Sequence, residues 1–155
     1  MESETISGND EYEISTDNKR LDLGLIHDFL ANGSYWARGI PFETVKRSVE
    51  HSLCFGVFHH DGQVGFARVV TDSATFAYLG DVFILEAHRG KGLGKWLLRT
   101  VLGHPDLARL RMISLGTRDA HGLYERYGFK RIAGTDLVGR LMVIENPNAY
   151  GKKGP

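Results

Sequence analysis

The stretch AHRGKGLGKWLL, residues 87–98, holds three glycines and two lysines within six positions and then becomes strongly apolar. Glycines let successive backbone N–H groups turn toward one anion, because no Cβ stands in the way. The apolar residues that follow predict a helix, whose N-terminal dipole would act on the same anion. The stretch therefore predicts a phosphate-binding loop. The alternative is a plain strand-to-helix turn in which glycine only reverses the chain.

The spacing of the glycines decides between kinds of phosphate-binding loop. A Walker A loop has four residues between its first glycine and its Gly-Lys pair, followed by Ser or Thr to hold magnesium. Here only three residues intervene, and Trp96 stands at the hydroxyl position. The glycines recur at every second residue, which also misses the G-x-G-x-x-G dinucleotide pattern. What remains is R-x-x-G-x-G, formed by Arg89, Gly92 and Gly94, and a nucleotide-hydrolysing P-loop is disfavoured.

The neighbours of the loop complete a strand–loop–helix–strand unit. Residues 75–85 are rich in β-branched and aromatic residues and predict a strand, and apolar residues at helical spacing over 93–103 predict a helix. Residues 110–117 predict a short buried strand. A crossover of this kind is right-handed and makes its two strands parallel.

The rest of the chain predicts further strands and helices around this unit. Upstream we expect a strand over 12–17, helices over 21–33 and 40–52, and hairpin strands over 53–60 and 63–71; downstream we expect a helix over 118–128 and a last strand over 139–145. The chain is expected to form a single mixed α/β domain over 11–146, with a flexible N-terminus over 1–10 and a flexible tail over 147–155.

Composition limits the partners and the location of the protein. The chain has 155 residues, 42% of them hydrophobic, and its 19 Lys and Arg balance its 19 Asp and Glu. No global charge therefore argues for nucleic acid or an anionic membrane as a partner. The single cysteine, Cys54, excludes an internal disulfide framework. The acidic N-terminus lacks the apolar region of a secretory signal, and no apolar run approaches the ~20 residues of a membrane span, so we expect a cytoplasmic protein.

Two ordered motifs resemble those of the GNAT N-acetyltransferase superfamily. The segment VFILEAHRGKGLGKWLL, residues 82–98, resembles the loop that binds acetyl-coenzyme A in that family. The segment DAHGLYERYGF, residues 119–129, resembles its A-x-x-L-Y-x-x-x-G-F motif. Two positions depart from the family pattern: Thr117 stands where many members have asparagine, and Glu86 replaces the common proline before the loop.

The resemblance implies a fold, a reaction and a cofactor site. The fold would be a central, mostly antiparallel sheet with a splayed parallel strand pair, flanked by helices. The reaction would move the acetyl group of acetyl-CoA to a primary amine by direct attack in a ternary complex. The backbone of Phe83 and Ile84 would pair with the pantetheine amides, Gly80 would permit the bulge that starts the splay, and Thr117 would keep a weaker pantetheine contact. The phosphates would be held by Arg89, Gly90, Lys91, Gly92, Leu93, Gly94 and Lys95.

Three side chains are candidates for the proton transfers. Tyr124 is the candidate donor to the leaving thiolate, because a phenol with a pKa near 10 stays protonated at neutral pH; otherwise it packs or positions the cofactor. Asp81, a carboxylate in an apolar strand, is the leading candidate for the base that takes the proton of the amine. Its alternatives are pairing with Arg68 or with a helix terminus, or the binding of a cationic substrate. His121 is a second candidate base and a candidate substrate-binding residue, or else a surface residue.

Recognition of the acceptor is expected from the loop around Tyr35 and Trp36, whose aromatic rings would either face an amine or cap the core. The acceptor would be a small-molecule or peptide amine, and the protein a monomer or a homodimer. His59-His60 lacks a third ligand, so no metal site is expected. The alternative function is a non-catalytic acyl-CoA-binding or sensing module, which the substitution at Thr117 favours.

Overall fold

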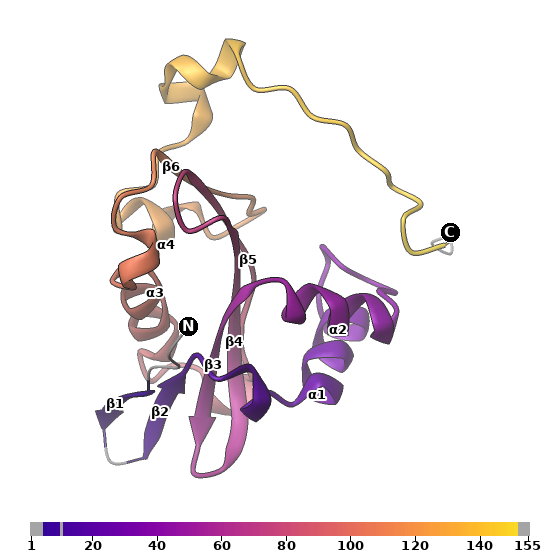
Figure 1. Ribbon diagram of the computed structural model, residues 1–155, viewed down its shortest axis with the longest axis vertical. Helices are drawn as coiled ribbons and strands as arrows, with labels where there is room; N and C mark the ends of the chain where they lie inside the picture. Colours follow the sequence, from indigo (N-terminus) through magenta and orange to yellow (C-terminus); the bar gives the residue numbers. More distant parts are fainter. Residues whose placement is uncertain (1–4, 10, 152–155) are drawn as a thin grey trace.

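The computed structural model describes residues 5–9 and 11–151. In this part of the chain, six strands form one sheet in the order β1-β2-β3-β4-β5-β6, and every neighbouring pair is antiparallel except the parallel pair β5–β6 (Figure 1). The strands are β1 (Thr5–Asn9), β2 (Tyr12–Ser15), β3 (Leu53–His59), β4 (Gly62–Thr71), β5 (Phe76–Ile84) and β6 (Met112–Leu115).

Helices cover both faces of the sheet (Figure 1). Helix α1 (Leu23–Asp28) and helix α2 (Phe42–Glu50) pack on one face, where Ile26, Val45 and Val49 meet Phe66 and Phe83. Helix α3 (Leu93–Leu102) and the short helix α4 (His121–Glu125) lie on the other face. The expected fold class, a mostly antiparallel sheet with a parallel pair and flanking helices, is confirmed.

Local sequence signals account for the helix ends. The Asp22 carboxylate accepts a hydrogen bond from the Leu25 N–H at 3.0 Å and so caps α1. Pro41 precedes α2, and its fixed φ suits a helix start. Helix α3 begins after Gly92, whose φ of 79° is left-handed, and ends at Gly103. These capping residues, which are visible in the sequence, therefore explain where the helices begin and end.

The parallel pair separates halfway along β5. Strand β6 pairs with β5 only from Phe76↔Met112 to Leu79↔Leu115, whereas β5 continues to Ile84 beside β4. The last five residues of β5 therefore have a strand neighbour on one side only. The register with β4 shifts within the same stretch, which marks a β-bulge.

The bulge is centred on Asp81, and the prediction for Gly80 needs correction. Asp81 has a φ of 54°, in the left-handed region, whereas Gly80 does not. Aspartate is one of the few non-glycine residues that enter this region readily. Asp81, and not Gly80, therefore adopts the left-handed conformation in the bulge. Gly80 is the residue before it.

Two predictions at the chain ends were wrong. Residues 5–9, expected to be flexible, form β1 because they pair antiparallel with β2. Residues 139–145 were expected to form a last strand. Gly139 instead ends the second of two short 3-10 helices (Ile132–Gly134 and Asp136–Gly139), and residues 141–146 adopt no regular structure. A strand needs a neighbour for its backbone hydrogen bonds, and among the residues that the structure describes this segment pairs with no strand. Of the expected tail, 147–151 form turns, and 152–155 lie outside the described residues.

Candidate functional site

The glycine loop has the backbone of an anion-binding turn. Gly90 and Gly92 both have φ of 79°, a conformation that side chains other than glycine rarely adopt. Gly94 has no left-handed φ, and a Cβ built there would meet nothing within 4 Å. The fold itself therefore does not demand glycine at position 94. A glycine in the first turn of α3 leaves room for a ligand at the helix N-terminus.

The cations of the loop are held by the strands beside it. Arg89 Nε donates to the Ile84 carbonyl at 2.8 Å, which fastens the loop to the end of β5. Lys91 Nζ donates to the Tyr12 hydroxyl at 3.3 Å, and that hydroxyl lies 2.9 Å from His88 Nδ1. The Lys95 side chain is exposed. Tyr12 and His88, which sequence patterns did not single out, thus position one lysine of the loop.

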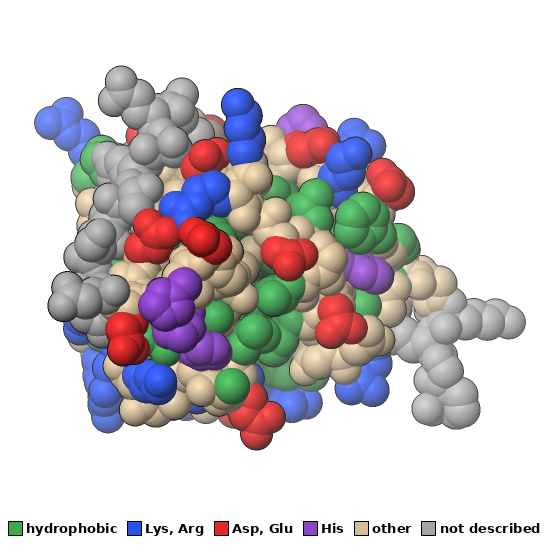
Figure 2. Space-filling view, turned by 90° about the horizontal axis from the view of Figure 1, so that it is seen from below, with side chains coloured by type: hydrophobic (Ala, Val, Ile, Leu, Met, Phe, Trp, Pro, Cys, Tyr) green, Lys and Arg blue, Asp and Glu red, His purple; other side chains and the backbone are tan. Residues whose placement is uncertain are grey.

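Histidines gather at the same end of the molecule. Figure 2 shows them as a cluster on one face, and ring contacts join His59 to His60 at 4.3 Å and to His88 at 5.2 Å. Among the described residues, no group of three His, Cys, Asp or Glu side chains is arranged to hold a metal ion. Nor does any helix in the described ranges have the length and apolar character needed to span a membrane.

The unpaired end of β5 offers backbone groups beside the loop. The Leu85 N–H donates to the Val64 carbonyl at 2.8 Å, and Ile84 is the next residue in register, opposite Gly65. Antiparallel pairs alternate between bonded and non-bonded, so the backbone groups of Ile84 face away from β4. Those of Phe83, opposite Phe66, face β4. Of the two residues predicted to meet pantetheine, only Ile84 presents its backbone to the open side.

Tyr124 lies in α4 against the main core, where its ring makes an edge contact with Phe129 at 5.7 Å. Its hydroxyl makes no hydrogen bond to any described residue. Burial raises the pKa of Tyr124, and the nearby Tyr35 raises it further. The phenol therefore stays protonated at neutral pH.

The loop after α1 reaches across to the chain that leaves β6. The Tyr35 hydroxyl accepts a hydrogen bond from the Arg118 N–H at 2.8 Å, and the Arg118 guanidinium lies 4.0 Å from the centre of the Tyr35 ring. Trp36 meets Tyr35 edge to face at 5.0 Å. These two rings therefore lie beside the point where β5 and β6 separate. Arg118 was missed at the sequence level, because a single arginine before a helix carries no distinctive pattern.

Asp81 is bonded on both oxygens. Trp36 Nε1 donates to Oδ1 at 2.9 Å, and Arg68 Nε donates to Oδ2 at 2.7 Å. Arg68 also donates to the Ser52 hydroxyl at 3.2 Å, so this guanidinium ties β4 to the end of α2. Pairing with Arg68 was one of the alternatives that the sequence left open for Asp81. The contacts make this carboxylate the anchor of the Trp36 side chain.

Thr117 and His121 flank the start of α4. Thr117 Oγ1 accepts the Ala120 N–H at 3.1 Å, which leaves the hydroxyl proton free to be donated. His121 is the first residue of α4 and is half-buried. No hydrogen bond or ion pair joins its ring to another described residue, so its assignment to the acceptor side stays a prediction.

Comparisons with known proteins identify the family of the chain. Residues 50–131 match the family model described as an acetyltransferase (GNAT) domain. A curated protein of Gibberella zeae, named "Putative acetyltransferase", is 30% identical over 164 aligned residues that cover 90% of this chain and 92% of that protein.

Solved structures extend the likeness to the fold. A crystal structure of a GNAT-family protein from Xanthomonas campestris pv. campestris has 50% sequence identity and a TM-score of 0.87, and covers 94% of this chain and 100% of that one. A GNAT family acetyltransferase of Elizabethkingia anophelis, solved with acetyl-CoA bound, has a TM-score of 0.59 at 16% identity, over 79% of this chain and 78% of that one. The second likeness is one of fold alone.

Proposed function

The chain belongs to the GNAT acetyltransferase family, and we propose that it moves the acetyl group of acetyl-CoA to a primary amine. The observation that carries the proposal is the glycine loop beside the unpaired end of β5. A loop with left-handed glycines, an open position at Gly94 and a free strand edge suits a ligand with a pyrophosphate and an amide-bearing arm.

In this proposal the residues of the loop bind the cosubstrate. Backbone N–H groups from Arg89 to Lys95 receive the pyrophosphate, and Lys91 and Lys95 add charge at the rim. The outward N–H of Ile84 pairs with a pantetheine amide carbonyl, while the Ile84 carbonyl is already bonded to Arg89 Nε. The Thr117 hydroxyl donates one further hydrogen bond.

Tyr124 is the proposed acid. The amine nitrogen forms the new bond to the thioester carbonyl carbon, the carbon–sulfur bond breaks, and the departing thiolate takes the proton of the Tyr124 hydroxyl. The proton that the amine nitrogen loses passes through water to the Tyr124 phenolate and restores the hydroxyl. Two features support this role: the hydroxyl has no hydrogen-bond partner among the described residues, and the raised pKa keeps it protonated.

The acceptor is proposed to approach past Tyr35 and Trp36. Both rings are partly exposed, each at 39%, so they retain surface for contact with a substrate. We assign Asp81 the role of holding Trp36 in place, since both its oxygens are already bonded. The chemical class of acceptor, a small-molecule or peptide amine, follows from the family reaction.

A thiol-release assay tests the proposal. Acetyl-CoA is mixed with polyamines, amino acids, aminoglycosides and peptides in turn, and free CoA is measured with and without enzyme. Acceptor-dependent release, with the acetylated amine identified by mass, is the expected result. Tight acetyl-CoA binding with no release across the panel would instead favour the non-catalytic binding module.

A further inference from the structure

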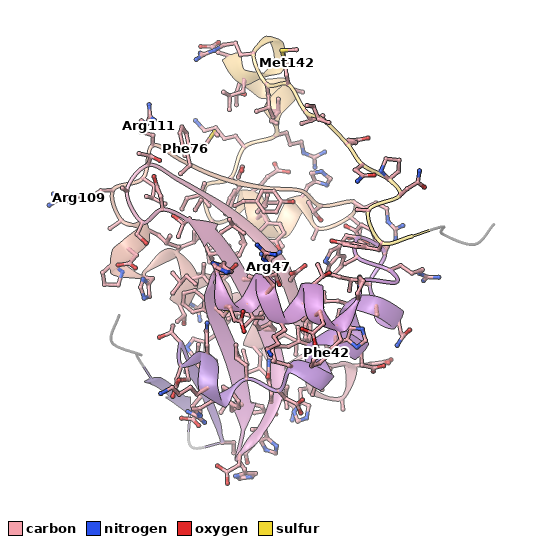
Figure 3. All side chains as sticks on the ribbon, turned by 45° about the vertical axis from the view of Figure 1, so that its right-hand side comes forward. Phe42, Arg47, Phe76, Arg109, Arg111 and Met142 are labelled. Carbon is pink, nitrogen blue, oxygen red and sulfur yellow. The ribbon has the colours of Figure 1, made fainter. Side chains whose placement is uncertain are left out.

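The segment after the last 3-10 helix exposes four consecutive apolar residues. Leu141 is 51% exposed, Met142 93%, Val143 74% and Ile144 102%. Figure 3 shows Met142 at the far end of the molecule, away from the sheet. The composition is that of a strand, with two β-branched residues and no proline or glycine. Water is a poor environment for such a run, so the segment needs a partner.

Strand β6 has an open edge to which a strand such as residues 141–144 can pair. It ends the sheet and is hydrogen-bonded to β5 alone among the described strands, so its other edge presents unpaired N–H and C=O groups. Its residues, Met112 to Leu115, include no charged side chain that would discourage pairing. Ile113 and Leu115 already pack against the main core, so a strand added here would extend an existing apolar layer.

The sheet next to this edge is also uncovered. Phe76 of β5 is 45% exposed and stands in register with Met112, and Tyr78 of β5 is 48% exposed. On β4, Val70 is 45% exposed and pairs with Tyr78. Figure 3 shows Phe76 at this end of the molecule, with the Arg111 guanidinium 4.6 Å from its ring centre. An apolar surface therefore continues from the open edge onto the sheet.

We infer that residues 141–144 of one copy add to the β6 edge of a second copy, and that the exchange is reciprocal. Each copy carries both an open edge and an apolar strand-forming segment, so a two-fold pairing covers both at once. The course of the chain favours a second copy over the chain's own edge, because after the last 3-10 helix the segment runs away from its own β6 (Figure 1). The missing last strand then forms only in the dimer.

Disulfide trapping tests the pairing. In a Cys54→Ala background, one chain carries Ser114→Cys on β6, and a second, mass-tagged chain carries Met142→Cys, Val143→Cys or Ile144→Cys. Mixed and refolded together, then oxidised, the two should form a cross-linked heterodimer for at least one of the three positions. A chain with both cysteines that closes a disulfide within itself, while remaining a monomer by light scattering, would overturn the inference.

A charge variant tests the same surface without cysteine. Met142→Asp with Ile144→Asp should weaken dimerisation by at least a hundredfold, because both carboxylates would have to be buried against the partner. Asn148→Asp with Tyr150→Asp adds equal charge outside the segment and should leave the dimer intact. Circular dichroism should show both variants folded. Wild-type protein that is monomeric at every concentration, or a Met142/Ile144 variant that dimerises like wild type, would refute the pairing.

Discussion

The fold does not require glycine at position 94, so we attribute this glycine to ligand binding. Glycine costs about 0.5–1 kcal/mol relative to alanine inside a helix, and a Cβ at this position would meet no protein atom. Glycine is unfavourable in a helix, and no neighbouring protein atom excludes a larger residue at position 94. We therefore infer that this glycine serves ligand binding. Gly92, by contrast, is required by its left-handed backbone.

Gly94→Ala should therefore raise thermal stability and lower affinity for acetyl-CoA. The stability gain should be about 0.5–1 kcal/mol by denaturant titration, and affinity should fall about tenfold by calorimetry, because the methyl group occupies space left for phosphate. Gly122→Ala, also helical and unobstructed, is the matched control for stability. Unchanged affinity in Gly94→Ala would remove the loop from the cosubstrate site.

Tyr124 carries the proposed proton transfer. Tyr124→Phe should lower kcat roughly a hundredfold or more while leaving acetyl-CoA affinity nearly unchanged, since only the hydroxyl is lost. The pKa of Tyr124 is raised, so the protonated donor persists beyond the ordinary range near 10. In wild-type enzyme kcat should therefore fall only as pH rises through that elevated pKa. A kcat equal to wild type in the variant would reduce Tyr124 to a packing residue.

At the scale of elements, the loop that carries Tyr35 and Trp36 is held in place by residues at the point where β5 and β6 separate. Trp36 and Tyr35 come from the loop after α1, Asp81 from the bulge in β5, and Arg118 from the segment after β6. Together they bridge the gap that opens where β5 and β6 part. A bulge in one strand thus positions a loop that is distant in the sequence.

Asp81→Asn tests whether this carboxylate anchors the loop or acts as base. The amide keeps an oxygen for Trp36 Nε1 but loses the ion pair with Arg68. As an anchor, the variant should raise the acceptor KM several-fold, lower kcat less than tenfold, and leave the shape of the pH–rate profile unchanged. Loss of the acidic limb of the profile, together with a hundredfold drop in kcat, would identify Asp81 as the base.

Most elements could be predicted from the sequence because their signals are local. The glycine loop, the amphipathic helix after it and the β-branched runs before it need no knowledge of the rest of the chain. The position of the bulge at Asp81 could not be predicted, and the sequence could not decide between the ion pair with Arg68 and its alternatives, because both depend on the register between β4 and β5. The strand expected over 139–145 shows the opposite limit: the strand signal is present, but none of the described strands pairs with this segment.

For the molecule as a whole, direct transfer requires that no side chain carries the acetyl group. Cys54 is buried, and burial raises the pKa of its thiol to about 12, so the thiolate is scarce at neutral pH. Folded protein should resist iodoacetamide at neutral pH, and initial-rate plots should intersect, as they do for a ternary complex. Parallel lines and rapid inactivation by the reagent would instead indicate an acyl-enzyme.

In the proposed function, the phosphates that the glycine loop binds belong to acetyl-CoA. Calorimetric titration of the 155-residue chain with acetyl-CoA, and separately with ATP, measures this directly. We predict one site per chain with micromolar affinity for acetyl-CoA and at least a hundredfold weaker binding of ATP. Tight binding of ATP with no heat from acetyl-CoA would contradict the account.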